Sequence, residues 1–391
     1  MPYSPSRARR SLFRVFAAFT LIAGLSACDP AAFGGGPRVD PGAPVTVALM
    51  VPGGTGDPQF DLISRNLTNA AQLAVSDLDG VEINLKIYQT ARSSERAAQL
   101  ARQAVGEGAS IIVGPLDASS ANAVAVAVAD TGVNVLSFSN NPAIAGGNTF
   151  ILGNTFQNTA DRLVNYASRA GKSSYVVVSG RTPAEEVGRE AVIQAIGRSG
   201  GRVVNDSNFA MSQEGVVAAG PGIAASAEAS GADAVFLTSS TQDALPLLMQ
   251  LLPENGLTPG TYQYIGLTRW DIPSSALSLP GVQGGWFALP DQNATQQFQA
   301  RYQAAYGSPP HPLAGLAYDG IAAVGALVKT RGNDALTKSA LTQGNGFAGA
   351  TGVFRFRNDG TNQRGLAVAT IENNQVRVID PAPRRLGSAG F

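Results

Sequence analysis

Side chains that could act as nucleophiles, bases or zinc ligands are scarce in this chain. His311 is the only histidine and Cys28 the only cysteine among 391 residues. Prolines surround His311 in the run Pro309–Pro312, which predicts a rigid surface loop before a helix. Acyl-transfer catalysis needs a nucleophile with a base, and zinc sites are built largely from Cys and His. We therefore expect neither an enzyme nor a zinc site, although carboxylate-only metal sites stay open.

A glycine-rich stretch, Pro52–Gly56, follows the first apolar run of the body. Gly54 can bring backbone close to a bound molecule because glycine has no Cβ, and Thr55 adds a hydroxyl beside it. No Lys-Ser or Lys-Thr pair follows the stretch and no GxGxxG pattern accompanies the run, so we expect no nucleotide and no cofactor. An ordinary tight turn explains the stretch equally well.

Most candidate residues lie where short apolar runs end. From Val45 onward, uninterrupted apolar runs alternate with longer amphipathic stretches, which is typical of repeated βα units with a parallel sheet. Runs without polar alternation suit strands that are covered on both faces. The predicted strands are Val45–Val51, Val81–Tyr88, Ile111–Val113, Val133–Leu136, Tyr175–Val178, Arg202–Asn205 and Val235–Leu237.

Amphipathic helices are predicted between these strands. Along Ser94–Glu107 the apolar residues recur at i, i+3, i+4, i+7 and i+8, and Gly108 ends the helix. After Trp286 the order changes to consecutive helices and then to antiparallel strands. The other predicted helices are Gln59–Asp77, Ser119–Asp130, Gln157–Ala170, Pro183–Ser199, Val216–Ala229, Thr241–Leu252, Gln292–Tyr306, Ala314–Lys329 and Leu336–Leu341.

The first 27 residues have the layout of an export signal. Four arginines precede the uncharged apolar run Val15–Gly24, which at about ten residues is too short to span a bilayer. The run closes with Leu25–Cys28, which resembles the lipobox of bacterial lipoproteins. We therefore expect a lipidated Cys28 that holds the mature protein at the inner or outer membrane. Residues 29–44 are predicted to be a flexible tether and residues 381–391 an unpacked tail.

Charge and size narrow the class of protein further. The chain has 28 basic and 28 acidic residues, and loss of the first 27 residues removes four arginines and no acid. A mildly acidic body of this kind is not expected to bind nucleic acid. With 44% apolar residues, the mature chain has material for two cores, because single cores seldom grow beyond about 250 residues.

The order of elements and several motifs together resemble the type I periplasmic binding proteins of the leucine/isoleucine/valine-binding class, over Val45–Ile379. The resemblance implies a two-lobed α/β fold in which each lobe is a mostly parallel sheet flanked by helices. It also implies three crossings between lobes, expected near Thr155, Pro290 and Gly346. Lobe 1 would then hold residues 45–155 and 291–346, and lobe 2 residues 156–290 and 347–380. The motifs are Pro52–Gly56, Gly114–Leu116, Leu136–Pro142, Gly231–Val235, Ala317–Gly320 and Gly349–Gly352.

The resemblance also implies a ligand in the cleft between the lobes. Relatives present hydroxyl and backbone groups to an amino acid where this chain has Ser139 and Asn141. Ser119 and Ser120 either meet the ligand carboxylate, as in relatives, or cap a helix. Ser239 stands where relatives carry an aromatic residue, so we do not expect a standard branched-chain amino acid. The candidate ligand residues are Ser139, Asn141, Ser119, Ser120, Gly54, Thr55, Glu185, Ser239, Arg269 and Trp270.

Two functions are compatible with these features. The lipobox, the tether and the stretches Leu251–Gly256 and Ile265–Asp271 resemble the penicillin-binding protein activators, a group of lipoproteins. We therefore expect first a non-enzymatic regulator that contacts a peptidoglycan synthase. The alternative is a solute receptor that closes on a small amphipathic ligand and delivers it to an ABC permease. Both are binding modules without a cofactor.

Overall fold

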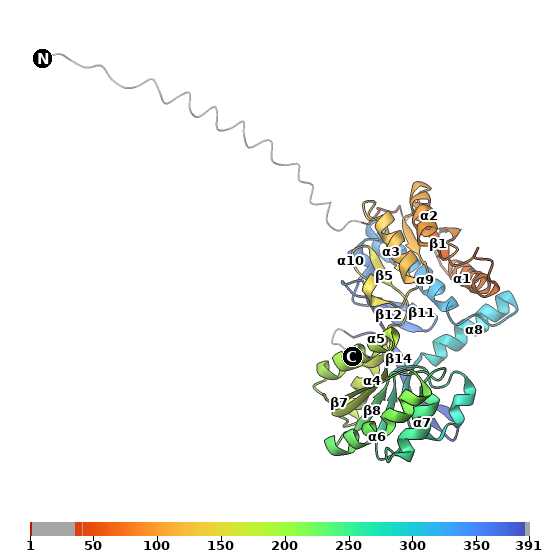
Figure 1. The fold of residues 1–391 in the computed structure, drawn as a ribbon. Helices are drawn as coiled ribbons and strands as arrows, with labels where there is room; N and C mark the ends of the chain where they lie inside the picture. The colour runs from red at the N-terminus through yellow and green to blue at the C-terminus, as the bar shows by residue number, and fades with distance from the viewer. Residues whose placement is uncertain (2–35, 41, 388–391) are drawn as a thin grey trace. The chain divides into compact units, whose positions relative to one another are not determined.

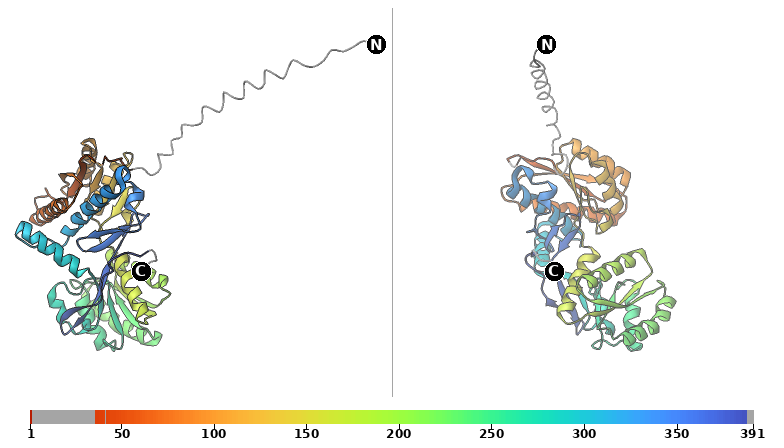
Figure 2. Two further views of the ribbon diagram at one scale, coloured as in Figure 1. Left: turned by 180° about the vertical axis from the view of Figure 1, so that it is seen from behind. Right: turned by 90° about the vertical axis from the view of Figure 1, so that its left-hand side faces the viewer.

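The computed structural model describes residues 1, 36–40 and 42–387. The predicted export signal after Met1, Cys28, tether residues 29–35 and 41, and tail residues 388–391 lie outside the described residues. Residues 36–391 form one compact unit. Within it, Figure 1 and the two views of Figure 2 show two α/β lobes. In the part of the chain that is described, no helix is long and apolar enough to cross a membrane.

Lobe 1 is built on a five-stranded parallel sheet with the order β2-β1-β3-β4-β5. Val47 and Leu49 of β1 face one core of the lobe, whereas Ala48 and Met50 face another. Apolar cover on both faces explains why the sequence shows uninterrupted apolar runs rather than alternation. The strands are β1 (Val45–Val51), β2 (Ile83–Gln89), β3 (Ile111–Val113), β4 (Asn134–Ser137) and β5 (Thr149–Ile151).

Helices cover both faces of this sheet. α1 and α9 pack on one face, and α2 and α3 pack on the other. α8 packs against α1, where the hydroxyl of Tyr302 donates a hydrogen bond to Asn66 Oδ1 at 2.9 Å. These helices are α1 (Pro58–Ser76), α2 (Ser94–Gly106), α3 (Ala118–Ala127), α8 (Gln292–Tyr306), α9 (Ala314–Arg331) and α10 (Lys338–Leu341).

Lobe 2 contains a seven-stranded sheet with the order β15-β14-β10-β9-β8-β6-β7. The last two strands of the chain, β14 and β15, run antiparallel at one edge. The strands are β6 (Ser174–Gly180), β7 (Arg202–Phe209), β8 (Ala234–Leu237), β9 (Gln263–Gly266), β10 (Trp286–Pro290), β14 (Leu366–Glu372) and β15 (Gln375–Asp380). One face is covered by α4 (Phe156–Arg169) and α5 (Pro183–Arg198), the other by α6 (Gln213–Ser230) and α7 (Leu245–Glu254).

A small antiparallel sheet corrects the expected lobe boundary. Its strands are β11 (Phe347–Gly349), β12 (Gly352–Phe356) and β13 (Asn362–Arg364). Phe354 and Phe356 pack in the lobe 1 core, whereas Leu366 packs in lobe 2. The third crossing is therefore at Gly365, and its expected position near Gly346 is wrong. This boundary could not be predicted from the sequence, because β13 and β14 follow each other without a turn.

Buried polar groups fix the segments where the chain crosses between lobes. Arg364 on β13 donates from Nε to the carbonyl oxygen of Leu152 at 2.8 Å and forms an ion pair with Asp319 at 2.9 Å. Asn158 of lobe 2 donates to Asn362 Oδ1 of lobe 1 at 2.5 Å. Since unpaired buried polar groups are strongly unfavourable, these contacts define the conformation of the crossings.

Both ends of the described body pack more than the sequence suggested. Val39 is buried in the lobe 1 core, and its N–H donates to the carbonyl oxygen of Asn333 at 3.1 Å. Leu386 is buried, and the carbonyl oxygen of Gly387 accepts a hydrogen bond from Arg355 at 3.2 Å. The expected tether and tail are therefore anchored to the body at these residues.

Candidate functional site

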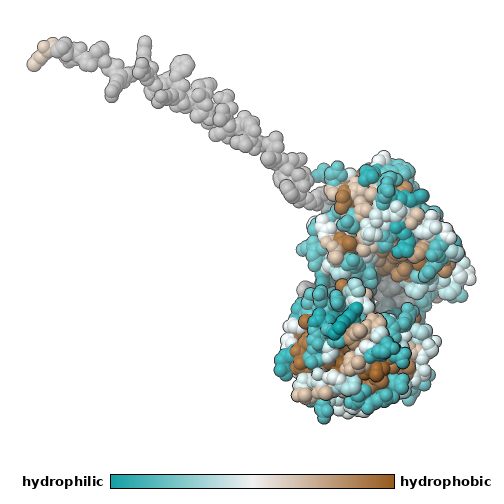
Figure 3. Space-filling model, in the orientation of Figure 1, coloured by the Kyte–Doolittle hydropathy of each residue, from teal (hydrophilic) through white to brown (hydrophobic). Residues whose placement is uncertain are grey.

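A cavity of about 580 Å³ lies between the lobes, at the carboxyl ends of β3, β4 and β9. Ligands of open parallel α/β sheets bind at these ends, where loop backbone and side chains are available. Figure 3 shows the surface hollowed between the two lobes. Lobe 1 contributes Leu116, Phe138, Ser139 and Asn140, and lobe 2 contributes Leu267, Thr268, Arg269 and Ile272.

The floor of this cavity is made by the crossings themselves. Segments 153–156, 288–290 and 364–366 all line it, together with Leu313 and Leu316 at the start of α9. A rotation of one lobe on the other would therefore change the width of the cavity directly. The sequence motifs contain Leu116, Ser139 and Thr351 of the cavity lining. The apolar lining from Leu313 and Leu316 was missed, because these residues have the pattern of an ordinary helix core.

Ser139 is the lobe 1 candidate that the structure places in the cavity. Its side chain is buried, and its Oγ accepts a hydrogen bond from the backbone N–H of Asn141 at 3.1 Å. The hydroxyl hydrogen of Ser139 is thus available to a ligand. Asn141 itself does not line the cavity. Its Oδ1 accepts from the N–H of Ala143 at 3.0 Å and so caps a short 3₁₀ turn, Pro142–Ile144.

Ser119 and Ser120 open α3, but Asp117 is the residue that caps the helix. Asp117 Oδ1 accepts from the hydroxyl of Ser119 and from the N–H of Ser120, both at 2.9 Å. The fully buried hydroxyl of Ser120 has no hydrogen-bond partner among the described residues. A protein carboxylate therefore occupies the helix end that the resemblance gives to a ligand carboxylate. Asp is a favoured cap residue, so the sequence did contain this signal.

Glu185 and Ser239 bind each other within lobe 2. The Glu185 carboxylate accepts from the N–H of Gly180 at 2.5 Å, from Thr238 Oγ1 at 2.7 Å and from Ser239 Oγ at 2.9 Å. Glu185 and Ser239 are both buried, and neither lines the cavity. Their contacts join the first turn of α5 to the ends of β6 and β8, which is a framework role.

Arg269 and Trp270 are neighbours with different environments. Trp270 is 0% exposed, stacks on Phe287 with ring centroids 6.4 Å apart, and leaves no room for a Cβ at Gly266. It belongs to the lobe 2 core. Arg269 lines the cavity, and its Nε and Nη2 bind the two oxygens of Asp271, each at 2.5 Å.

Gly54 and Thr55 lie in an exposed loop outside the cavity. Gly54 has a φ of +85°, which favours glycine, and its N–H donates to Asp61 Oδ1 at 3.2 Å. Thr55 Oγ1 accepts from the N–H of Asp57 at 3.0 Å. Gly54 borders a different hollow beside Gln89 of β2. The structure thus places these two residues apart from Ser139 and Arg269.

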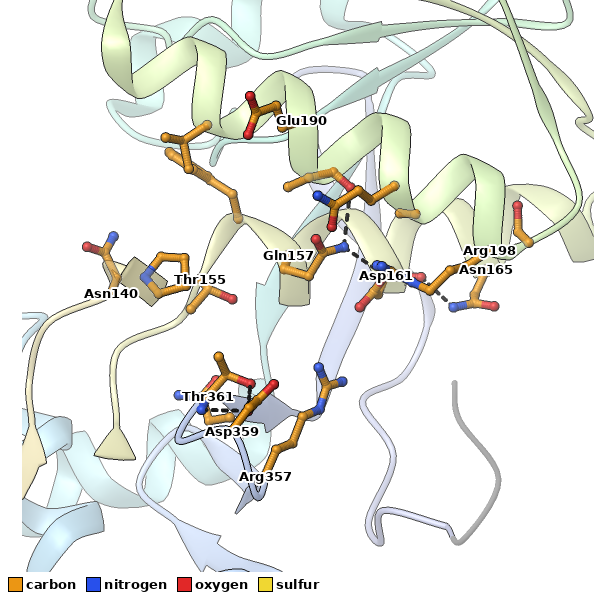
Figure 4. Close-up of a pocket in the computed structure, with 18 residues that line it drawn as sticks. Asn140, Thr155, Gln157, Asp161, Asn165, Glu190, Arg198, Arg357, Asp359 and Thr361 are labelled. Carbon is orange, nitrogen blue, oxygen red and sulfur yellow. Dashed lines mark hydrogen bonds and ion pairs between the residues drawn. The ribbon is translucent and has the colours of Figure 1, made fainter. Parts of the chain in front are cut away.

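A second cavity of about 680 Å³ adjoins the first and is drawn in Figure 4. It lies between α4 and α5 of lobe 2 and the turn before β13, and it shares Asn140, Thr155 and Phe156 with the first cavity. Among its charged residues, Arg198 and Asp161 form an ion pair at 2.5 Å, whereas the side chains of Glu190 and Arg357 have no hydrogen-bond or ion-pair partner among the described residues. This groove contains none of the apolar residues Leu116, Phe138, Leu267 and Ile272 that line the first cavity from both lobes.

Metal binding finds no support in the described residues, which contain no cluster of three or more His, Cys, Asp or Glu side chains. His311 is half-buried, and burial lowers the pKa of its imidazole below the usual value. Its Nδ1 accepts from the N–H of Leu313 at 3.2 Å. This hydrogen bond orders the loop before α9.

Comparison with known proteins gives one family and many similar structures. A family model described as "Periplasmic binding protein" matches residues 44–375. A putative branched-chain amino acid ABC transporter from Rhodospirillum rubrum superposes with a TM-score of 0.73 at 18% identity, covering 86% of this chain and 100% of that one. No curated protein matches the chain.

Two further structures were determined with ligands. An ABC transporter substrate-binding protein from Desulfitobacterium hafniense in complex with Leu has a TM-score of 0.61 and 16% identity, covering 86% of this chain and 100% of that one. A solute binding protein of an ABC transporter from R. palustris in complex with benzoate has a TM-score of 0.55 and 19% identity, covering 89% and 99%. These likenesses confirm the predicted two-lobed α/β fold.

Proposed function

Because the chain belongs to the periplasmic binding protein family, we propose that it is a solute receptor that closes its lobes on a small ligand and delivers it to an ABC permease. Membership in this family implies a periplasmic location and a binding role rather than an enzymatic one. Lipidation at Cys28 would keep such a receptor at the membrane that holds its permease.

The observation that carries this proposal is the cavity between the lobes. Its volume of about 580 Å³ falls within the ~300–1,000 Å³ of typical small-molecule sites. Its lining is largely apolar, with a few polar groups such as Ser139 and Arg269 supplied by opposite lobes. A ligand that contacts both lobes stabilises the closed arrangement, which is how binding becomes a signal to a permease.

The regulator of peptidoglycan synthesis was the first expectation from the sequence. The similar structures are described as ABC transporter binding proteins, which favours the receptor over the regulator. The proposed protein partner is accordingly an ABC permease rather than a peptidoglycan synthase.

A thermal-shift screen of the purified protein against amino acids, organic acids, amides and sugars tests the receptor function. A ligand at 100 times its Kd adds about 2.7 kcal/mol of stability, which raises the melting temperature measurably. Ser139→Ala should weaken the effect, whereas Asn141→Ala, two residues away and outside the cavity, should leave it intact. Absence of any shift, with co-purification of a peptidoglycan synthase, would support the regulator instead.

A further inference from the structure

We infer that the ligand is a small carboxylate with an apolar body and no ammonium group, and that Arg269 binds its carboxylate. This inference rests on the receptor function proposed above, and it concerns the chemistry of the same cavity. It follows from which charges line the cavity and which of them are already paired.

The ionisable side chains that line the cavity are Arg269 and Arg364, and no Asp or Glu lines it. An ammonium group of a ligand would be desolvated in the cavity without a carboxylate to pair with, and it would lie near two guanidinium groups. Burial of an unpaired charge is strongly unfavourable. The lining therefore offers a ligand ammonium no carboxylate partner, and only donors that Arg269 leaves free could favour an anionic group.

Of the two arginines, Arg364 uses four of its five N–H donors within the protein. Its Nε and Nη2 both donate to the carbonyl oxygen of Leu152, and its Nη1 donates to Asp319 at 2.9 Å and to Thr351 Oγ1 at 3.2 Å. Its charge is balanced by the buried Asp319 carboxylate. Arg364 is thus a structural residue of the cavity floor, and it contributes little to the binding energy of a ligand.

Arg269 keeps free donors. A guanidinium group has five N–H donors, and Asp271 takes one from Nε and one from Nη2. Both donors of Nη1 lack a protein partner among the described residues, and the side chain is 36% exposed. Arg269 can therefore bind a second carboxylate while it stays oriented by Asp271, which is the geometry that favours Arg in carboxylate recognition.

The lobe 1 position for a ligand carboxylate is blocked. Asp117 already accepts the hydrogen bonds at the N-terminus of α3, and a second carboxylate there would be repelled. Glu185, an acid at the start of α5 in lobe 2, is also unavailable to a ligand ammonium. Glu185 is bound by three donors of its own lobe and lies outside the cavity lining.

The rest of the lining fits an apolar body. Leu116 and Phe138 come from lobe 1 and Leu267 and Ile272 from lobe 2, with the hydroxyl of Ser139 as a polar group among them. Ile272 is half exposed without a ligand, so an apolar molecule between the lobes would cover it. Aliphatic and aromatic monocarboxylates have this combination of groups.

Isothermal titration of the purified protein with two matched series tests the inference. The first series is 4-methylpentanoate, L-leucine and 3-methylbutylamine, and the second is 3-phenylpropanoate, L-phenylalanine and 2-phenylethylamine. Within a series the apolar body stays the same while the carboxylate or the ammonium is removed. We expect at least one carboxylate to bind at least tenfold more tightly than its amino acid, and the amines not to bind.

Two substitutions should act in opposite directions. Arg269→Gln should weaken carboxylate binding at least tenfold, whereas Asp271→Asn should tighten it, because it removes the competing carboxylate from the guanidinium. Arg377→Gln, at an exposed ion pair with Glu372 outside the cavity, is the matched control and should change nothing. A purely structural role of the Arg269–Asp271 pair would make both substitutions weaken binding.

The outcomes separate this inference from the receptor function. Tighter binding of leucine or phenylalanine than of its carboxylate analogue would overturn the inference and leave the receptor function standing. Equal loss of binding in Arg269→Gln and Asp271→Asn would also overturn it. If neither series nor the wider solute screen gave any binding, the inference and the receptor function would both fail.

Discussion

Replacement of Glu185 by Ala tests whether the structure separates framework residues from ligand residues correctly. The buried carboxylate accepts from Gly180 N–H, Thr238 Oγ1 and Ser239 Oγ, so the substitution leaves three donors without this acceptor. Thr238 keeps a weaker contact with the carbonyl oxygen of Val178 at 3.4 Å. Two fully unpaired donors at about 1–3 kcal/mol each would lower the free energy of unfolding by roughly 2–6 kcal/mol.

Urea denaturation followed by tryptophan fluorescence is the appropriate assay. The chain has two tryptophans, Trp270 and Trp286, and both lie in lobe 2 with Glu185. The fluorescence transition therefore reports the unfolding of lobe 2 even if the lobes unfold separately. Glu185→Ala should shift this transition to lower urea.

Glu186→Ala is the matched control for this prediction. Glu186 is the next residue on the same first helical turn, but it is exposed. Both substitutions remove an acid near a helix N-terminus, an effect of about 0.3–1 kcal/mol, so their difference isolates the buried hydrogen bonds. If both variants were equally stable while Glu185→Ala abolished ligand binding, the framework assignment of Glu185 would be refuted.

Three other substitutions test other parts of the structure. Arg364→Met leaves the Asp319 carboxylate buried without its partner and should cost about 3–5 kcal/mol at neutral pH. Burial raises the pKa of Asp319, and loss of Arg364 should raise this pKa further. The folded variant then binds a proton more readily than the unfolded chain, so its urea midpoint should recover as the pH is lowered from neutral. A loss of stability that does not change with pH would contradict this. Trp270→Ala should lower the free energy of unfolding of lobe 2 by about 3–5 kcal/mol in urea denaturation and leave the Kd for the carboxylate unchanged. Loss of binding in a folded variant would instead assign Trp270 to the binding site. Phe354→Ala should shift the unfolding of lobe 1, measured by circular dichroism, to lower urea and leave the tryptophan fluorescence transition unchanged. A shift of the tryptophan transition would indicate that β12 belongs to lobe 2.

The periodic elements were largely predictable from the sequence. The helix predicted over Ser94–Glu107 is observed over Ser94–Gly106, because a complete apolar stripe and a cap residue mark it. The strand β5 was missed, since its three residues, Thr149–Ile151, are too few to show a period. β7 continues from Asn205 to Phe209 through polar residues, because an edge strand with exposed positions tolerates them.

The site was predictable only in part. Ser139 and Arg269, both candidate ligand residues, line the cavity. Ser139 follows the predicted strand Val133–Leu136, and Arg269 belongs to the stretch Ile265–Asp271. Glu185 looked like a ligand residue because the sequence shows an acid at the start of a helix. Its partner Ser239 is 54 residues away in sequence, and local reasoning cannot decide whether two such residues face each other or a ligand. Acids and hydroxyls at helix starts are equally suited to capping and to binding.

A crystal structure of the protein with the solute that gives the largest thermal shift tests the central claim most directly. We expect the solute to lie between the lobes, with its anionic group on Arg269 and its polar contact to lobe 1 at Ser139. A solute bound in the groove between α4 and α5, or on one lobe only, would contradict it.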